Sequence, residues 1–141
     1  MTNVRLLETQ EELARCVPVL RELRPKFIDT ETMLLALGIL RDEGAGFAAL
    51  EHNGEVATVA VFRLQHMLVS GRTMYVDDLV TAERFRSQGH GKTMLHWLME
   101  HAKSQGCATF SLDSGTFREE AHAFYFREGL RIKSFHFAKP L

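Results

Sequence analysis

Two neighbouring segments decide the fold: Asp77-Asp78-Leu79-Val80-Thr81 and, after a short loop, Arg86-Ser87-Gln88-Gly89-His90-Gly91-Lys92-Thr93. The first segment continues a run that is rich in β-forming residues. The residues that follow the second segment recur at the three-and-four spacing of one helix face: Met94, Leu95, Leu98, Met99 and Ala102. The sequence here therefore predicts a strand, a glycine-bearing loop and the start of a helix.

The start of this helix is a candidate anion site. The first turn of a helix has backbone N–H groups without partners and a partial positive charge, and both stabilise a phosphate group. Gly89 and Gly91 lack a Cβ atom, so a ligand can approach the backbone closely. Arg86 and Lys92 add two cations to the same turn. The alternative is a strand-to-helix turn that needs glycine for its geometry alone.

This loop shares residues with three phosphate-binding motifs. A P-loop would end in Gly91-Lys92-Thr93, but Arg86 stands in the place of its first glycine. A dinucleotide fingerprint would need a third glycine, and Met94 stands there. The pattern Arg/Gln-x-x-Gly-x-Gly/Ala does fit. It resembles the pyrophosphate-binding motif of the GNAT superfamily of N-acetyltransferases, whose cofactor is acetyl-coenzyme A.

Length and composition narrow the class of protein. The 141 residues fit a single domain, 1–141, and a net charge of −1 disfavours a nucleic-acid-binding surface. The N-terminus lacks the apolar run of a signal peptide, and no stretch approaches the roughly 20 apolar residues of a membrane span. We therefore expect a cytoplasmic protein that binds neither nucleic acid nor membrane. Cys16 and Cys107 are expected to be free thiols, and the scattered histidines predict no metal site.

Periodicity and turn signals predict the order of the elements. Strands are expected over 3–7, 47–51, 56–67, 72–81 and 108–113, with a final strand or strand pair over 130–139. Helices are expected from about 10 to 23, from a cap at Asp29 or Thr30 to about 43, and over 91–104 and 118–128. Pro18 is expected to kink or break the first helix. The strand–helix–strand unit from 72 to 113 predicts a parallel pair of strands.

A second pattern lies near the end of the chain. Ala121-x-x-Phe124-Tyr125-x-x-x-Gly129-Leu130 resembles the GNAT helix that carries Phe-Tyr and ends at a glycine. The resemblance implies a mixed α/β (α+β) GNAT fold in the order β-α-α-β-β-β-α-β-α-β(-β), with a central, mostly antiparallel mixed sheet of six or seven strands and about four flanking helices. The tail from Phe117 to Leu141 is similar to that of small bacterial GNATs such as aminoalkylphosphonate N-acetyltransferases.

The resemblance also implies a reaction, in which a primary amine directly attacks acetyl-CoA in a ternary complex. Tyr125 stands at the position of the usual general acid, and a phenol with a pKa of about 10 is protonated at neutral pH. A base must take a proton from the attacking ammonium group. Asp77 and Asp78 are adjacent, so they are expected to point to opposite faces of a strand. Asp78 is preferred and Asp77 is the alternative; a cap or an arginine-paired role is open for either.

Further residues are implied to bind the cofactor. The pantetheine arm would bond to the main chain near Leu79, Val80 and Thr81. The pyrophosphate would be held by backbone N–H groups and side-chain donors of Arg86, Gln88, Gly89, His90, Gly91, Lys92 and Thr93. Ser114 stands where many members have asparagine, and Phe124, which is also expected to pack in the core, completes the set.

The acceptor implied by the resemblance is the amine of a small molecule. A protein or peptide amine is one alternative, and a catalytically silent acyl-CoA-binding module is another. The resemblance also implies a homodimer.

Overall fold

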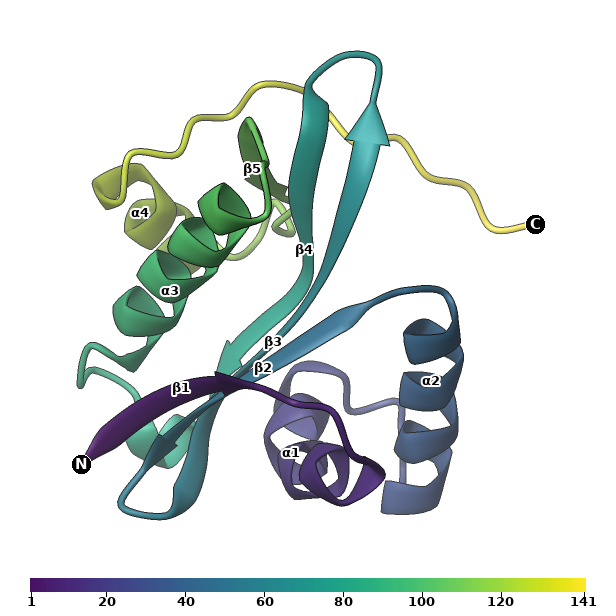
Figure 1. Ribbon diagram of the computed structural model, residues 1–141, viewed down its shortest axis with the longest axis vertical. Helices are drawn as coiled ribbons and strands as arrows, with labels where there is room; N and C mark the ends of the chain where they lie inside the picture. Colours follow the sequence, from purple (N-terminus) through teal and green to yellow (C-terminus); the bar gives the residue numbers. More distant parts are fainter. The chain divides into compact units, whose positions relative to one another are not determined.

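The computed structural model describes all residues, Met1–Leu141, in two compact units, Met1–Ser111 and Leu112–Leu141 (Figure 1). The first unit contains, in chain order, β1 (Thr2–Leu6), α1 (Gln10–Leu23), α2 (Thr30–Asp42), β2 (Gly46–His52), β3 (Glu55–Met67), β4 (Gly71–Thr81), the 3-10 helix η1 (Glu83–Phe85), α3 (His90–Ser104) and most of β5 (Thr109–Leu112). The second unit contains α4 (Glu119–Arg127) and the C-terminal segment. This order matches the prediction as far as α4.

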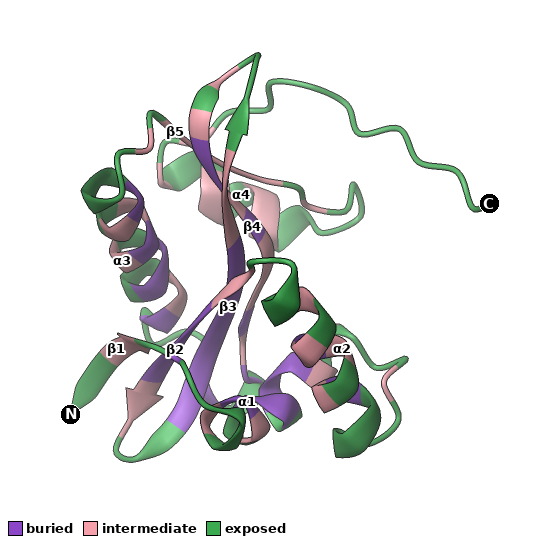
Figure 2. Ribbon diagram, turned by 45° about the vertical axis from the view of Figure 1, so that its right-hand side comes forward, coloured by how far each residue is buried: buried purple, intermediate pink, exposed green.

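One five-stranded sheet organises the first unit, with its strands in the order β1-β2-β3-β4-β5. The first four strands form an antiparallel meander, and α3 provides the crossover from β4 to β5. The predicted meander and crossover are therefore confirmed. In Figures 1 and 2, α1 and α2 lie on one side of these strands and α3 lies on the other.

The core lies in the middle strands of this sheet, because helices cover both of its faces. Residues 56–62 of β3 are buried without interruption, and the same is true of residues 47–50 of β2 (Figure 2). A strand that is covered on both faces is apolar along its whole length instead of alternating. From α3, the helix face predicted from its spacing supplies Met94, Leu95 and Leu98, all fully buried.

The helix starts follow the sequence closely. Thr9 and Glu12 form the predicted capping box of α1, and Asp29 caps α2 by accepting the Thr32 N–H at 2.8 Å.

Of the kink or break predicted at Pro18, the break is wrong, because α1 runs without interruption from Gln10 to Leu23. An interior proline costs a helix about 3 kcal/mol. The residues on either side of it, Val17 and Val19, are buried in the core together with Leu13 and Leu20. Packing of this helix face offsets the cost.

The predicted strand or strand pair over 130–139 is also wrong. Residues 130–141 form no strand, so the sheet has five strands instead of six or seven. Apolar residues of this segment are exposed, Ile132 by 69%, Phe135 by 82% and Phe137 by 93%. Alternation marks a segment that could join a sheet, but a strand also needs hydrogen bonds to a neighbouring strand, and local sequence does not supply them.

Three further features concern function: the two cysteines, possible metal ligands and possible membrane-spanning helices. Cys16 and Cys107 are free, and burial raises the pKa of the Cys16 thiol to about 12, which keeps it protonated at neutral pH. No three histidine, cysteine or acidic side chains are grouped so that they could hold a metal ion. No helix combines the length and the apolar character that crossing a bilayer requires.

Replacing Gly46 is expected to disturb the sheet. Gly46 pairs with Phe62, and a Cβ atom at Gly46 would lie 2.5 Å from Cζ of the Phe62 ring. Gly46→Ala should therefore lower the free energy of unfolding by about 1–3 kcal/mol through overpacking. Gly38→Ala is the matched control, since its Cβ meets nothing within 4 Å inside α2, and it should raise stability by about 1 kcal/mol. Urea denaturation measures both, and a Gly46→Ala curve at or above wild type would contradict this packing.

Candidate active site

The glycine-bearing loop joins η1 to α3. Its four residues from Arg86 to Gly89 are exposed, whereas Phe85 and His90 at its two ends are buried. Ser87 and Gly89 both have left-handed backbone conformations, with φ of 62° and 81°. Glycine takes such angles freely, but for serine they cost roughly 1–2 kcal/mol. The loop thus keeps a strained shape even where the sequence has no glycine.

The first turn of α3 is open to an anion. No side chain caps it and no acidic residue lies in it. The N–H of Thr93 donates to the carbonyl oxygen of Gly89 at 3.0 Å, and the Thr93 hydroxyl donates to the same oxygen at 3.1 Å. The N–H groups of His90, Gly91 and Lys92 precede this first intrahelical bond and have no acceptor within the helix.

The surroundings of this turn fit a pyrophosphate. A Cβ atom at Gly89 would meet nothing within 4 Å, so the space next to the backbone is free. Lys92 and Gln88 are exposed, and so is Arg86, whose Nε donates to the Thr81 carbonyl oxygen at 3.3 Å. Donors and cations therefore surround a helix start that carries partial positive charge.

His90 differs from its neighbours in the loop. Its side chain is 6% exposed and packs against the rings of His52, at 5.0 Å between centroids, and Phe85, at 6.1 Å. Because its ring is packed inside, the donor that His90 has left for a ligand is its backbone N–H.

The end of β4 extends beyond the strand beside it. Leu79, Val80 and Thr81 pair with β3 on one side. On the other side β5 starts level with Arg72, where the Ala108 N–H donates to the Arg72 carbonyl oxygen at 2.8 Å, and β5 is four residues long. Because β4 continues for nine residues past Arg72, β5 cannot accompany it to Thr81. On this side the backbone of Leu79, Val80 and Thr81 is therefore not paired with β5.

The two aspartates lie at a β-bulge. The register of β3 with β4 passes from Val61 opposite Asp78 to Phe62 opposite Val76, so Asp77 is the extra residue. The expectation that Asp77 and Asp78 point to opposite faces assumed regular alternation of side chains along β4. A bulge interrupts this alternation, so the assumption does not hold here.

Each aspartate has its own arginine. Nε of Arg24, the C-cap of α1, donates to Oδ1 of Asp78 at 2.7 Å. Nε of Arg63 donates to Oδ2 of Asp77 at 3.0 Å. The other oxygen of Asp77, Oδ1, is buried and has no hydrogen-bond partner. Burial raises the pKa of Asp77, and the Arg63 guanidinium opposes this rise.

Neither arginine was among the predicted site residues. Arg63 could have been found, because counting back from the predicted turn at Ser70-Gly71 places it near Asp77 on the opposite strand. Arg24 carries no such signal, since 54 residues separate it from Asp78.

The remaining candidates belong to the second unit, so the structure places the predicted site residues in two groups. Tyr125 lies on α4, half-buried, with its ring 5.3 Å from that of Phe124. Burial raises the pKa of Tyr125, and the charge of Arg118 opposes the rise. The hydroxyl is therefore protonated at neutral pH. Oγ of Ser114 is buried and has no hydrogen-bond partner.

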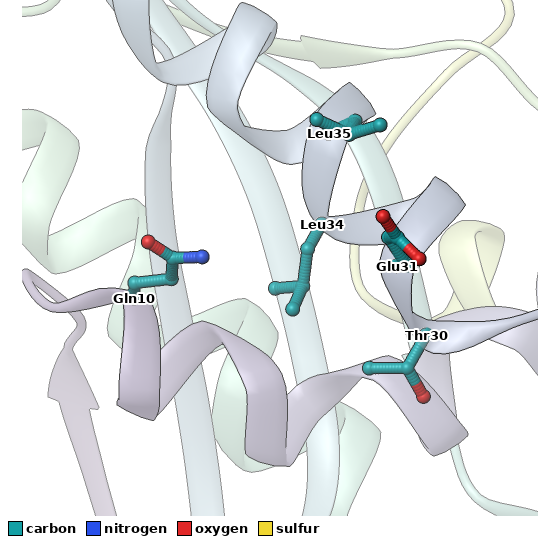
Figure 3. Close-up of a pocket in the computed structure, with 5 residues that line it drawn as sticks. All are labelled: Gln10, Thr30, Glu31, Leu34 and Leu35. Atoms are coloured by element: carbon teal, nitrogen blue, oxygen red, sulfur yellow. The ribbon is translucent and has the colours of Figure 1, made fainter.

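A depression of about 490 Å³ lies elsewhere in the first unit, at the N-terminal ends of α1 and α2 (Figure 3). It is lined by Gln10, Thr30, Glu31, Leu34 and Leu35. None of the predicted site residues lines it.

Known proteins that are similar to this chain include acetyltransferases. A sequence model described as the acetyltransferase (GNAT) family matches residues 6–129. A Bacillus subtilis (strain 168) protein named as an uncharacterized N-acetyltransferase, YhdJ, is 32% identical over 143 residues, covering 100% of both chains. An aminoalkylphosphonate N-acetyltransferase of Salmonella typhimurium is 30% identical over 103 residues, covering 72% of this chain and 67% of that protein.

A solved acetyltransferase structure from Trypanosoma brucei has a TM-score of 0.80 over 100% of both chains at 23% identity, a likeness that concerns the fold. The chain belongs to the GNAT family of acetyltransferases. It is an acetyl-CoA-dependent N-acetyltransferase, as the motifs of the loop and of α4 predicted.

Gly89 provides a test of the loop. Gly89→Ala should weaken acetyl-CoA binding at least about tenfold, because its methyl group would occupy the free space beside the N–H groups that bind the anion. Gly106→Ala is the matched control, with φ of 79° against 81° and open space at both positions. Both variants should lose similar stability, while only Gly89→Ala loses affinity in calorimetric titration. Equal affinities would contradict the assignment of this loop to the cofactor.

Proposed function

We propose that the protein transfers the acetyl group of acetyl-CoA to the primary amine of a small molecule, by direct attack in a ternary complex, and that residues 1–141 act as one N-acetyltransferase domain. The observation that carries this proposal is the buried, unpartnered oxygen of Asp77 at the bulge of β4. A lone pair held out of water is suited to accept a proton from an ammonium group. The Salmonella relative supports a small acceptor, since its name gives an aminoalkylphosphonate as the substrate.

Two parts of the first unit would hold the donor. The pyrophosphate would be bound at the start of α3 by the N–H groups of Gly89, His90, Gly91 and Lys92 and by the side chains of Arg86, Gln88, Lys92 and Thr93. The pantetheine arm would bond to the main chain of Leu79, Val80 and Thr81, along the part of β4 that β5 does not accompany. In the second unit, Phe124 and the unpartnered hydroxyl of Ser114 would contribute further contacts.

Asp77 is the better candidate for the base. An aspartate with a pKa near 3.9 is a weak base at neutral pH, and the burial that raises the pKa of Asp77 brings it closer to the working range. Arg63 holds one oxygen of Asp77, and the other, which is buried, has no hydrogen-bond partner. Asp78 stays the second candidate, with its Oδ1 engaged by Arg24 at 2.7 Å.

Tyr125 would act as the acid. The amine nitrogen bonds to the thioester carbonyl carbon, the carbon–sulfur bond breaks, and the departing thiolate takes the proton of the Tyr125 hydroxyl. Before the attack, the ammonium group loses one proton to Asp77, directly or through one water. After the attack, the nitrogen loses its second proton, which returns the Tyr125 phenolate to the phenol. A phenol whose pKa is raised by burial holds its proton until the thiolate forms.

The test is thiol release from acetyl-CoA by the purified protein. The acceptors offered are aminoalkylphosphonates, polyamines, amino acids, aminoglycosides and short peptides. Turnover with a small amine supports the proposal. Turnover with peptides alone would identify a peptide acetyltransferase, and binding of acetyl-CoA without turnover of any amine would identify an acyl-CoA-binding module.

Tyr125→Phe should lower kcat by roughly 10²–10⁴-fold, the usual range for losing a general acid. The affinity for acetyl-CoA should change little, because the ring is kept. Phe126→Tyr is the reciprocal control, since it adds a phenol at an exposed neighbouring position and should leave kcat unchanged. A Tyr125→Phe enzyme with wild-type kcat would refute the acid assignment.

Asp77→Asn and Asp78→Asn form a matched pair that separates the two candidate bases. A base must be deprotonated, so the wild-type kcat/KM should fall as the pH drops through the raised pKa of Asp77. Asp77→Asn should lower kcat about a hundredfold or more and abolish this acidic limb. Asp78→Asn should keep the limb. If the limb disappears with Asp78→Asn instead, Asp78 is the base.

A further inference from the structure

Three aromatic rings join the two ends of the cofactor loop below the surface. Phe85, at the end of η1, and His90, at the start of α3, approach each other edge to face at 6.1 Å between centroids. His52, at the end of β2, lies 5.0 Å from His90 and 6.1 Å from Phe85. This ring cluster of His52, Phe85 and His90 fixes both ends of a loop whose four intervening residues are all exposed.

The His90 imidazole is enclosed in a way that suits only its neutral form. Its Nε2 is buried and has no hydrogen-bond partner, so a proton added there would find no acceptor. Burial and the neighbouring His52 both lower the pKa of His90. The residue is also the first of α3, where the helix end carries partial positive charge and disfavours a cation.

The other charged groups around the cluster do not provide a counter-charge for His90. The guanidinium of Arg84 lies over the Phe85 ring at 4.9 Å and pairs with Glu55 at 3.2 Å. His52 is occupied by neutral partners, with its Nδ1 2.9 Å from Oγ1 of Thr2 and its Nε2 3.3 Å from Nδ2 of Asn53. Within the loop and the first turn, the charged side chains are the cations of Arg86 and Lys92.

We propose that His90 is a positioning residue for the cofactor loop: the neutral imidazole, packed between Phe85 and His52, holds the first turn of α3 in its binding shape, and protonation of the ring releases it. Affinity for acetyl-CoA then falls in acid. The inference rests on the proposed role of this loop in binding the pyrophosphate.

A His90 ring that contacts the ligand directly would give the opposite pH dependence. If the His90 ring could turn out toward the bound pyrophosphate, its protonation would strengthen binding through charge attraction, and affinity would rise in acid. The sign of the pH dependence therefore distinguishes a ring that positions the loop from a ring that contacts the ligand.

The experiment measures the dissociation constant of acetyl-CoA by calorimetry between pH 7.5 and 5.0 for wild type, His90→Leu and His66→Leu. Leucine keeps an apolar side chain at position 90 without a titrating group, and His66 is an exposed histidine on β3, away from the loop. Wild type and His66→Leu should lose about threefold or more in affinity over this range. His90→Leu, normalised to its own value at pH 7.5, should lose clearly less; protonation of the ligand's own phosphates affects all three proteins alike.

A second measurement uses wild type alone and does not depend on the folding of a variant. The His90 ring is titrated by NMR with and without coenzyme A, and its pKa should be lower in the complex. A pKa that is raised or unchanged by the ligand, or parallel profiles for wild type and His90→Leu, would overturn the inference. Failure of wild type to bind acetyl-CoA at pH 7.5 would instead refute the proposed role of the loop.

Discussion

Backbone N–H groups at the start of α3 need acceptors, and the chain supplies none from its own side chains. Most helices satisfy this need with a capping side chain, as Thr9 and Asp29 do for α1 and α2. At α3 no side chain meets this need, which is why we propose that an anionic ligand binds there. Next to this open turn, Ser87 and Gly89 have left-handed conformations and the rings of Phe85 and His90 are buried.

The second constraint is the β-bulge that inserts Asp77 into β4. An extra residue in a paired strand changes the direction of its side chain and bends the strand. Asp77 is thereby held by Arg63 at one oxygen while the other stays buried and unpartnered. A buried carboxylate oxygen without a partner is unfavourable for stability, and such an arrangement is a common feature of sites that perform chemistry. The Arg63 pair limits this cost without using the whole carboxylate.

Local patterns in the sequence predicted most of the fold. The capping box at Thr9, the hairpin turn at Asn53-Gly54 and the helical spacing after Gly91 depend on residues within a few positions of one another, and all three are present in the structure. The prediction failed where a distant part of the chain decides. Pro18 is tolerated because one face of its helix is buried in the core, and the segment after Leu130 is no strand because it has no partner strand.

The sequence by itself determined the class of this protein, because the motif around Gly89 and the one around Tyr125 each place their chemistry within a single loop or helix. It also determined the order of elements up to α4. Only the tertiary structure decided that Arg24 and Arg63 hold the two aspartates, that Asp77 is the extra residue of a bulge, and that the His90 ring is buried against His52. These features arise from register and packing between residues far apart in the chain, which hydrophobic periodicity and turn signals do not encode.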